Sequence, residues 1–294
     1  MRVVVQVPPG GLQDTIARAI APELAKLWGQ SVIVENRPSA GGVVAAEMVA
    51  RSAPDGYTIL QTGAGTVLAN EFLRKNLPYD SDRDFAPVIV LIESNNILVA
   101  SPKLGVNNIR ELIALARERG SELNYGSLGI GHNTHIDVEA MLREAGARAT
   151  HVPYKGGAQA LQAIASGEVS FAITGITAAI PLVRQGRIKG LAYAGLKRSE
   201  LFPDMPTLNE SGFPGFESGG WFGWFAPAGT PKAVIDRIAG DTGKVISVPA
   251  FKEKFITAGG HELVNAPSSA FAELLARQRK VFAAKIAPLK LQLE

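Results

Sequence analysis

Short β-rich apolar runs alternate with longer segments of helical periodicity almost from end to end of the chain, and this alternation restricts its fold most. We expect strands near 3–7, 31–35, 57–61, 95–100, 123–127, 149–152, 169–173, 189–195 and 221–226. Apolar residues recur at helical spacing between them, in 14–28, 42–51, 109–119, 134–144 and 158–166. Strands separated by helices favour an α/β fold with mixed, largely parallel sheets flanked by helices.

The length of the chain favours two compact units. Its 294 residues exceed the usual size of a single domain, and 46% hydrophobic with 19% charged residues is the balance of a folded protein. The irregular segment 199–220, rich in Pro, Gly and acidic residues, is typical of a connection between two such units.

Charge and hydropathy exclude two broad classes of protein. Thirty Lys and Arg against 27 Asp and Glu give a net charge of +3, and the basic residues are scattered, so no nucleic-acid partner is expected. The longest apolar stretches, such as 85–92, are too short to span a bilayer. The absence of cysteine excludes disulfides and thiol nucleophiles.

Common catalytic signatures do not match the sequence either. A serine-hydrolase elbow needs Gly two residues before the nucleophile, whereas Tyr125 stands at that place before Ser127. The Gly-x-Gly elements near Gly63 and Gly129 lack the rest of a dinucleotide fingerprint, and no phosphate-binding Gly-x-x-x-x-Gly-Lys loop occurs. We therefore expect a protein that is not an enzyme, with a hydrolase or lyase as the less favoured alternative.

Glycine and proline clusters stand where the expected strands pass into helices. These clusters lie at 8–11, 62–66, 127–131 and 155–157. In open parallel sheets, ligands bind outside the carboxyl ends of the strands, where such loops lie. Several of these loops are therefore candidates for the lining of one ligand site.

An ordered series of short motifs resembles the solute receptors of tripartite tricarboxylate transporters, over almost the whole chain. The matching segments are 3–5, 8–11 with Asp14, 29–38 (GQSVIVENRP), 40–42 (AGG), 53–58 (APDGYT), 77–80 (LPYD), 84–88 (DFAPV), 123–127 (LNYGS), 151–156 (HVPYKG), 203–207 (PDMPT) and 225–231 (FAPAGTP). Each segment alone is a weak signal, but the ordered set is highly specific.

This resemblance implies a two-lobed, type II periplasmic binding protein (Venus-flytrap) fold with the ligand cleft between its lobes. Members of the family typically cross between lobes twice, which places the crossings here near 100–101 and 221–224. Lobe 1 would then be discontinuous, formed by 1–100 and 225–294, and lobe 2 would be 101–224.

The resemblance also implies a function. It indicates an extracytoplasmic receptor that captures a small di-, tri- or aromatic carboxylate by hinge closure and delivers it to the large and small membrane subunits of the transporter. We expect a monomeric, periplasmic protein without a cofactor, whose export signal preceded Met1 and has been removed. A receptor that reports its ligand to a signalling partner would use the same closing lobes, so this alternative stays open.

The first candidate binding loop precedes the helix expected near 14–28. A carboxylate needs preset donors, and free amides and the dipole at a helix start supply them. The residues in question are Pro9, Gly10, Gly11, Leu12 and Gln13. A plain strand-to-helix turn would contain the same glycines. Leu12 and Gln13 replace the Pro and small residue that are usual in the family before Asp14.

The second candidate loop resembles the Ser-x-Gly-x-Gly loop that faces the ligand in the family. Its candidate residues are Ser127, Gly129, Gly131, His132 and Thr134. The alternative is a glycine loop with Thr134 as helix cap. His132 replaces an expected small hydroxyl residue, so ligand affinity could depend on pH near neutrality.

Further candidates complete the proposed wall. Thr62, Ala64 and Thr66 offer hydroxyls and amides at a strand end, or are simply a small-residue helix start. Tyr154 lies where a strand leaves for a loop, and Thr174 ends another strand. The pair Thr174-Gly175 stands where an Asp-Asn type is common in the family, so we expect a plain or aromatic carboxylate rather than an amino acid.

A metal site is conceivable at His132, His135, Asp137 and Glu139, because His135 and Glu139 lie one helical turn apart. We expect no metal, since no other convincing ligand set accompanies the two histidines. His135 is instead expected to be a buried, hydrogen-bonded residue that closes the loop.

Lys155, Trp221 and Trp224 lie near the same loops or crossings. Lys155 could attract anions, although a solvated lysine is the commoner outcome. The two tryptophans could line the cleft, and we expect core or hinge packing for both.

Overall fold

The computed structural model describes residues 1–154 and 156–289, so Lys155 lies outside the described residues. The chain divides into two compact units, Met1–Glu93 with Gly220–Glu294 and Ser94–Gly219. The strands β4 (Phe85–Ala100) and β9 (Gly219–Pro227) contain the two points where the chain passes from one unit to the other. Across the described residues, no helix combines the length and apolar character needed to cross a membrane.

The first unit is built on a mixed sheet. Its strand β1 (Arg2–Val5) lies between β2 (Ile33–Asn36) and β3 (Thr58–Gly63) and is parallel to both. Strand β9 pairs antiparallel with β3, and β10 (Glu262–Pro267) pairs antiparallel with the first part of β4. The parallel pairs bring the carboxyl ends of β1, β2 and β3 to one edge of the sheet.

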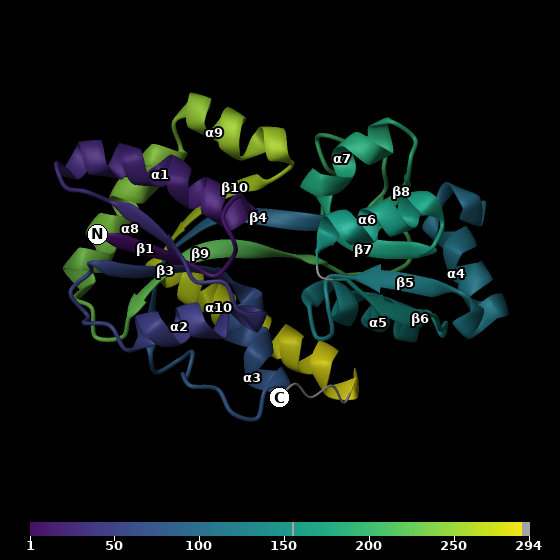
Figure 1. Ribbon diagram of the computed structural model, residues 1–294, viewed down its shortest axis with the longest axis horizontal. Helices are drawn as coiled ribbons and strands as arrows, with labels where there is room; N and C mark the ends of the chain where they lie inside the picture. Colours follow the sequence, from purple (N-terminus) through teal and green to yellow (C-terminus); the bar gives the residue numbers. More distant parts are fainter. Residues whose placement is uncertain (155, 290–294) are drawn as a thin grey trace. The chain divides into compact units, whose positions relative to one another are not determined.

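Helices cover both faces of this sheet because side chains alternate along a strand. Val3 and Val5 of β1 pack on the side of α1 (Leu12–Trp28), α8 (Lys232–Ile246) and α9 (Pro249–Phe255). Val4 packs on the side of α2 (Val43–Ala50), the π-helical turn Gly65–Ala69 leading into α3 (Asn70–Leu73), and α10 (Ser268–Ile286). Figure 1 shows α1 and α9 on one side of β1 and β3 and α2 on the other.

The second unit repeats this arrangement on its own sheet. Strand β5 (Asn124–Ser127) lies between β6 (Thr150–Pro153) and β7 (Phe171–Gly175), parallel to both. The second part of β4 pairs antiparallel with β7 and with β8 (Lys189–Tyr193).

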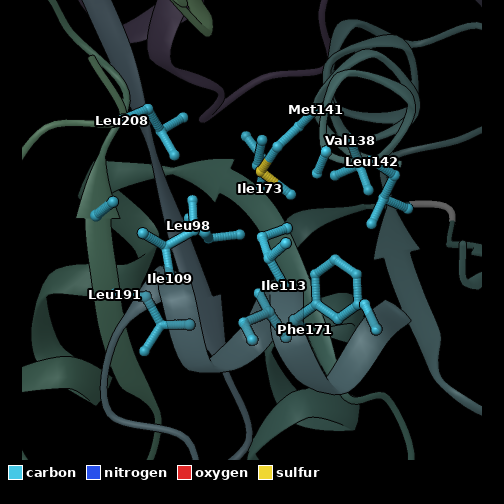
Figure 2. Packing of buried hydrophobic residues seen from close by; sticks show 14 of the residues in the cluster. Leu98, Ile109, Ile113, Val138, Met141, Leu142, Phe171, Ile173, Leu191 and Leu208 are labelled. Atoms are coloured by element: carbon cyan, nitrogen blue, oxygen red, sulfur yellow. The ribbon is translucent and has the colours of Figure 1, made fainter. Parts of the chain in front are cut away.

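Two helices cover each face of the second sheet. Leu98 and Ile173 face α4 (Ile109–Arg119) and α5 (Asn133–Glu144), whereas Val99 and Ala172 face α6 (Gly157–Ser166) and α7 (Ile176–Arg184). Figure 2 shows side chains of α4 and α5 gathered around Phe171 and Ile173. Short 3-10 turns lie at 40–42, 102–104, 120–122, 257–259 and 287–289.

The irregular segment 199–220, expected to connect the two units, belongs almost wholly to the second unit. Its residues Leu208, Phe213 and Phe216 are buried in the core formed by α4 and α5. Burial of these three apolar side chains ties the segment to the second unit, because removing large apolar surface from water stabilises the packed arrangement. Leu208 is visible in Figure 2 beside the other core residues.

Candidate functional site

The loop from β1 to α1 is organised by a buried carboxylate. Asp14 Oδ2 accepts a hydrogen bond from the N–H of Gly10 at 2.9 Å, and Asp14 Oδ1 accepts from Arg18 Nε at 2.9 Å and from Asn36 Nδ2 at 2.8 Å. Burial would raise the pKa of Asp14, but these hydrogen bonds and the charge of Arg18 together hold it below the ordinary value. Gly10 has φ +85, which glycine adopts at little cost. An ionised Asp14 therefore fixes this loop.

Helix α1 begins without a side-chain cap. Its N-cap is Gly11, whose own N–H donates to the carbonyl of Pro8 at 3.2 Å. The first-turn N–H groups of Leu12 and Gln13 have no partner within the helix, and the helix dipole adds positive potential at this end. Of the five predicted residues, Pro9 and Gly10 are exposed, Gly11 and Leu12 are half-buried, and Gln13 is buried.

The buried Gln13 is tied to the core of the first unit. Its carbonyl accepts from Gln61 Nε2 at 2.8 Å, and Gln61 Oε1 accepts from Trp224 Nε1 at 2.9 Å. Trp224 is fully buried and Trp221 is 3% exposed, which confirms core packing for both tryptophans.

Gln6, which the sequence analysis did not select, joins the predicted threonines at the end of β3. Thr62 Oγ1 donates to Gln6 Oε1 at 2.7 Å, and Thr66 Oγ1 contacts the same oxygen. The parallel register that pairs Val5 with Gln61 places Gln6 beside Thr62. Thr62, Ala64 and Thr66 are all buried, so both hydroxyls are already engaged by the protein.

A glycine loop approaches the same residues closely. Gly41 and Gly42 have φ values of +68 and +73. A Cβ atom on Gly42 would collide with Gln6 Oε1 and lie 2.6 Å from Thr66 Oγ1. The positive φ favours glycine at Gly42, where a Cβ atom would also displace the Gln6 side chain, and the carboxyl ends of β1 and β3 share one polar edge with this loop.

In the second unit, the loop from β5 to α5 is held at both ends. Ser127 Oγ lies 2.6 Å from His151 Nε2 and 3.1 Å from the carbonyl of Gly129. At the other end, the N–H of Gly131 donates to His135 Nδ1 at 3.1 Å. His135 is 5% exposed, so the expectation of a buried, hydrogen-bonded histidine that closes the loop is confirmed.

The start of α5 is capped by His132 rather than by Thr134. His132 Nδ1 accepts from the N–H of Thr134 at 3.2 Å, while Thr134 Oγ1 accepts from the N–H of Leu128 at 3.1 Å. Thr134 therefore holds the loop instead of the helix end. The structure brings together all five predicted residues of this loop, namely Ser127, Gly129, Gly131, His132 and Thr134.

Two more helices begin at the same edge of the second sheet. The N-caps of α6 and α7 are Gly156 and Gly175, and neither helix start has a side-chain cap. Thr174 is buried at the end of β7, and a Cβ atom built on Gly157 would lie 3.9 Å from both Thr174 Oγ1 and a methyl group of Leu128. Thr174 thus lies beside the candidate loop, as parallel strands require.

Tyr154 is connected to this edge through its backbone. Its N–H donates to the carbonyl of Ser127 at 2.9 Å, whereas its hydroxyl donates to Glu168 Oε1 at 3.3 Å. Burial and the nearby Glu168 raise the pKa of Tyr154. The Tyr154 side chain is therefore engaged with Glu168 rather than with a residue of the candidate loop.

A stack of aromatic rings lies beneath the β5–α5 loop. The rings of His135 and His151 lie 3.9 Å apart at 8°, and Tyr125 stacks on His151 at 5.0 Å. Burial lowers the pKa of each histidine to about 4. The charge of His132 also lowers the pKa of His135, and the charge of His135 lowers that of His151, which Glu139 partly raises again. Across 1–154 and 156–289, no group of three or more His, Asp or Glu residues could hold a metal ion.

The sequence matches a known protein family. Residues 16–291 match the model of the tripartite tricarboxylate transporter family receptor. Protein BugT of Bordetella pertussis is 32% identical over 268 residues, which cover 91% of this chain and 82% of that protein.

Solved structures agree with this match. R. palustris Rpa4515 with adipate has a TM-score of 0.86 at 31% identity and covers 98% of this chain and 97% of its own. MatC (Rpa3494) from Rhodopseudomonas palustris with bound malate has a TM-score of 0.84 at 31% identity, with 97% and 98% covered. These likenesses confirm the expected mixed α/β periplasmic binding protein fold. The relatives are solute-binding receptors and not enzymes, and the chain belongs to the tripartite tricarboxylate transporter receptor family.

Proposed function

We propose that this protein is a periplasmic receptor that captures a small carboxylate and delivers it to the large and small membrane subunits of a tripartite tricarboxylate transporter. The observation that carries the proposal is that helices start without side-chain caps at the carboxyl ends of parallel strands in both units. These starts are at Gly11, Gly156 and Gly175. Backbone N–H groups at such starts bind anions well, and family membership makes a carboxylate the anion of choice.

Among carboxylates, we favour a dicarboxylate with an aliphatic spacer. Two related receptors hold adipate and malate, which are both dicarboxylates. In this chain, Leu12 and Ile130 add apolar surface to the two candidate loops, and Ile130 is 57% exposed. The strand end at Thr174-Gly175 has no acidic side chain to pair with an ammonium group, so an amino acid is a poorer candidate.

We further propose that the two units act as lobes that close on the carboxylate. A ligand that takes hydrogen bonds from loops of both lobes binds the closed form more tightly and shifts the population toward it. The predicted ligand residues are the two loops 9–13 and 127–134 together with Thr62, Ala64, Thr66, Tyr154 and Thr174. In this proposal the receptor works as a monomer, and the membrane subunits recognise the closed form.

A thermal-shift screen of ligand-stripped protein tests the binding. The panel contains adipate, malate, citrate, an aromatic carboxylate and glutamate, and adipamide is the uncharged control that matches adipate in length. A dicarboxylate at 100 times its Kd should stabilise the folded protein by about 2.7 kcal/mol, while adipamide should have no effect. If no anion shifts the melting temperature and the protein instead hydrolyses or cleaves a substrate, the receptor proposal is wrong.

Small-angle X-ray scattering tests the closure separately. With a saturating dicarboxylate, the radius of gyration should fall relative to the ligand-free protein. Saturable binding with an unchanged radius would leave the carboxylate site standing but contradict closure. Uptake of the same dicarboxylate into vesicles that contain both membrane subunits, with and without the receptor, tests delivery.

A further inference from the structure

The loop Ser127–Gly131 is held at each end by a different imidazole, and the two imidazoles stack on one another. His151 Nε2 lies 2.6 Å from Ser127 Oγ, and His135 Nδ1 accepts the N–H of Gly131 at 3.1 Å. The two ring centroids lie 3.9 Å apart. A displacement of either ring would therefore disturb the contacts at both ends of the loop.

Three elements meet in this stack. His151 belongs to β6 and pairs in register with Tyr125 of β5, and His135 belongs to α5. The Tyr125 ring stacks on His151, and its hydroxyl donates to Glu139 Oε1 at 2.5 Å, one turn along α5 from His135. The stack thus packs the start of α5 against β5 and β6.

The hydrogen bonds assign the protons. His135 Nδ1 can accept from Gly131 only with a free lone pair, so the proton of the neutral ring is on Nε2. His151 can donate from Nε2 to Ser127 Oγ, whose own hydrogen then reaches the carbonyl of Gly129 at 3.1 Å. A second proton on His135 would abolish its bond to Gly131 and place a cation against the ring of His151.

We propose that His135 and His151 are positioning residues that hold the Ser127–Gly131 loop in one conformation before a carboxylate arrives. The N–H groups of Leu128, Gly129 and Gly131 already donate within this loop and to the start of α5, so they set its shape. The inference rests on the proposed function of this loop. Neither imidazole has to touch the ligand. Because the loop is ordered before the ligand arrives, binding does not have to supply the free energy of ordering it.

Matched substitutions separate positioning from simple packing. The Asn side chain in His135→Asn places an acceptor oxygen near the position of Nδ1, and the Gln side chain in His151→Gln places an N–H near the position of Nε2. His135→Phe and His151→Phe keep a planar ring and remove the hydrogen bond. Each Phe variant should bind adipate about tenfold more weakly than wild type, because one hydrogen bond that orders the loop is lost, while the Asn and Gln variants stay within about threefold.

Hydrogen exchange in the ligand-free protein provides a readout that does not depend on the identity of the ligand. Amides 128–131 should lose protection in the Phe variants and keep it in the Asn and Gln variants. His261→Asn is the control, because His261 is a buried imidazole of the first unit whose pKa burial also lowers to about 4. It should leave amides 128–131 unchanged.

The two proposals fail in different ways. Should wild type bind no carboxylate of the panel while the exchange contrast holds, the receptor proposal falls and the positioning pair stands. Equal protection of amides 128–131 in wild type and in all four variants would overturn the positioning pair, even if adipate binds. Equal losses in the Phe variants and in the Asn and Gln variants would also overturn it, because packing alone would then explain the effect.

A pH series adds a test that needs no Phe variant. The charge of His132 acts on His135, and the charges of His135 and Glu139 act on His151. Tyr125, which stacks on both rings, stays neutral because burial raises its pKa, and Asp137 acts on His132. Half of His135 is protonated at pH 4, so the adipate affinity of wild type relative to His135→Asn should fall about twofold between pH 7 and pH 4. The protonation of adipate itself cancels in this ratio, and a constant ratio would overturn the role of Nδ1 as acceptor.

Discussion

The loops at the start of α1 and at the start of α5 both lead from a parallel strand into a helix. An ionised side chain holds the first loop, and neutral side chains hold the second. The first loop is held by the carboxylate of Asp14, which accepts from Gly10 and Arg18 and must be ionised to do so. The second loop is held by His135 and His151, of which His135 must be neutral to accept from Gly131. One fold therefore uses two chemistries to order two helix starts.

Acid should act on these two loops over different pH ranges. The folded-state pKa of Asp14 is lowered, so its contribution to stability is present above pH 3.8 and is lost as pH falls through the folded pKa. His135 and His151 have folded pKa values of about 4 against an ordinary 6.5. The unfolded chain therefore binds more protons than the folded protein between pH 6.5 and 4. The free energy of unfolding falls as the pH is lowered across that window. In this window the folded histidines stay neutral and the loss comes from proton binding by the unfolded chain, while Asp14 keeps its full contribution.

The largest expected effect is the loss of stability between pH 7 and pH 5. His135, His151 and His261 each have a folded pKa of about 4, so each should cost about 2 kcal/mol over this interval, or on the order of 5 kcal/mol for all three. Urea unfolding at the two pH values measures the change. His135→Asn should recover the share of one imidazole. A stability that is flat from pH 7 to 5 would contradict the contrast between the two loops.

The next effect concerns the carboxylate of the first loop. Asp14→Ala leaves the N–H of Gly10 and the side chains of Arg18 and Asn36 without their shared acceptor, which should cost about 2–3 kcal/mol of unfolding free energy. Urea unfolding at pH 7 measures it. The control is Asp236→Asn, since Asp236 is exposed and pairs with Lys232 on the surface, and it should match wild type within error. Equal effects of the two substitutions would show that Asp14 does not organise the loop.

Periodicity predicted most of the fold, and its failures have local causes. The strand expected at 3–7 is β1 at Arg2–Val5, because the apolar run Val3–Val5 ahead of a Pro-Gly turn has few other interpretations. Strand β10 was missed, since it contains Pro267, and Asn265 has a positive φ at an irregularity in its pairing with β4. Helix α7 was missed because Pro181 interrupts its pattern.

The loops of the candidate site were predictable, but their supports were not. Glycines after a strand mark both loops, and Asp14 was visible as part of the family pattern. Gln6 could have been found as the first polar residue after the buried run Val3–Val5. The contact between His151 and Ser127 depends on the register of β6 against β5, and no local pattern in the sequence determines that register.

The smallest expected effect tests whether the ring stack under the second loop depends on its hydroxyl. Tyr125→Phe keeps the ring that stacks on His151 and removes the hydrogen bond to Glu139, a half-buried carboxylate that water can partly resolvate. We expect a loss of about 1 kcal/mol in unfolding free energy, with amides 128–131 still protected, because the imidazole bonds remain. Tyr154→Phe is the control, since its hydroxyl bond to Glu168 is long at 3.3 Å and lies near the surface, and it should change stability less. If Tyr125→Phe instead exposes amides 128–131 to exchange, the Tyr125 hydroxyl and not the imidazole pair holds the second loop. Each helix start would then be ordered by a carboxylate, Asp14 at α1 and Glu139 at α5.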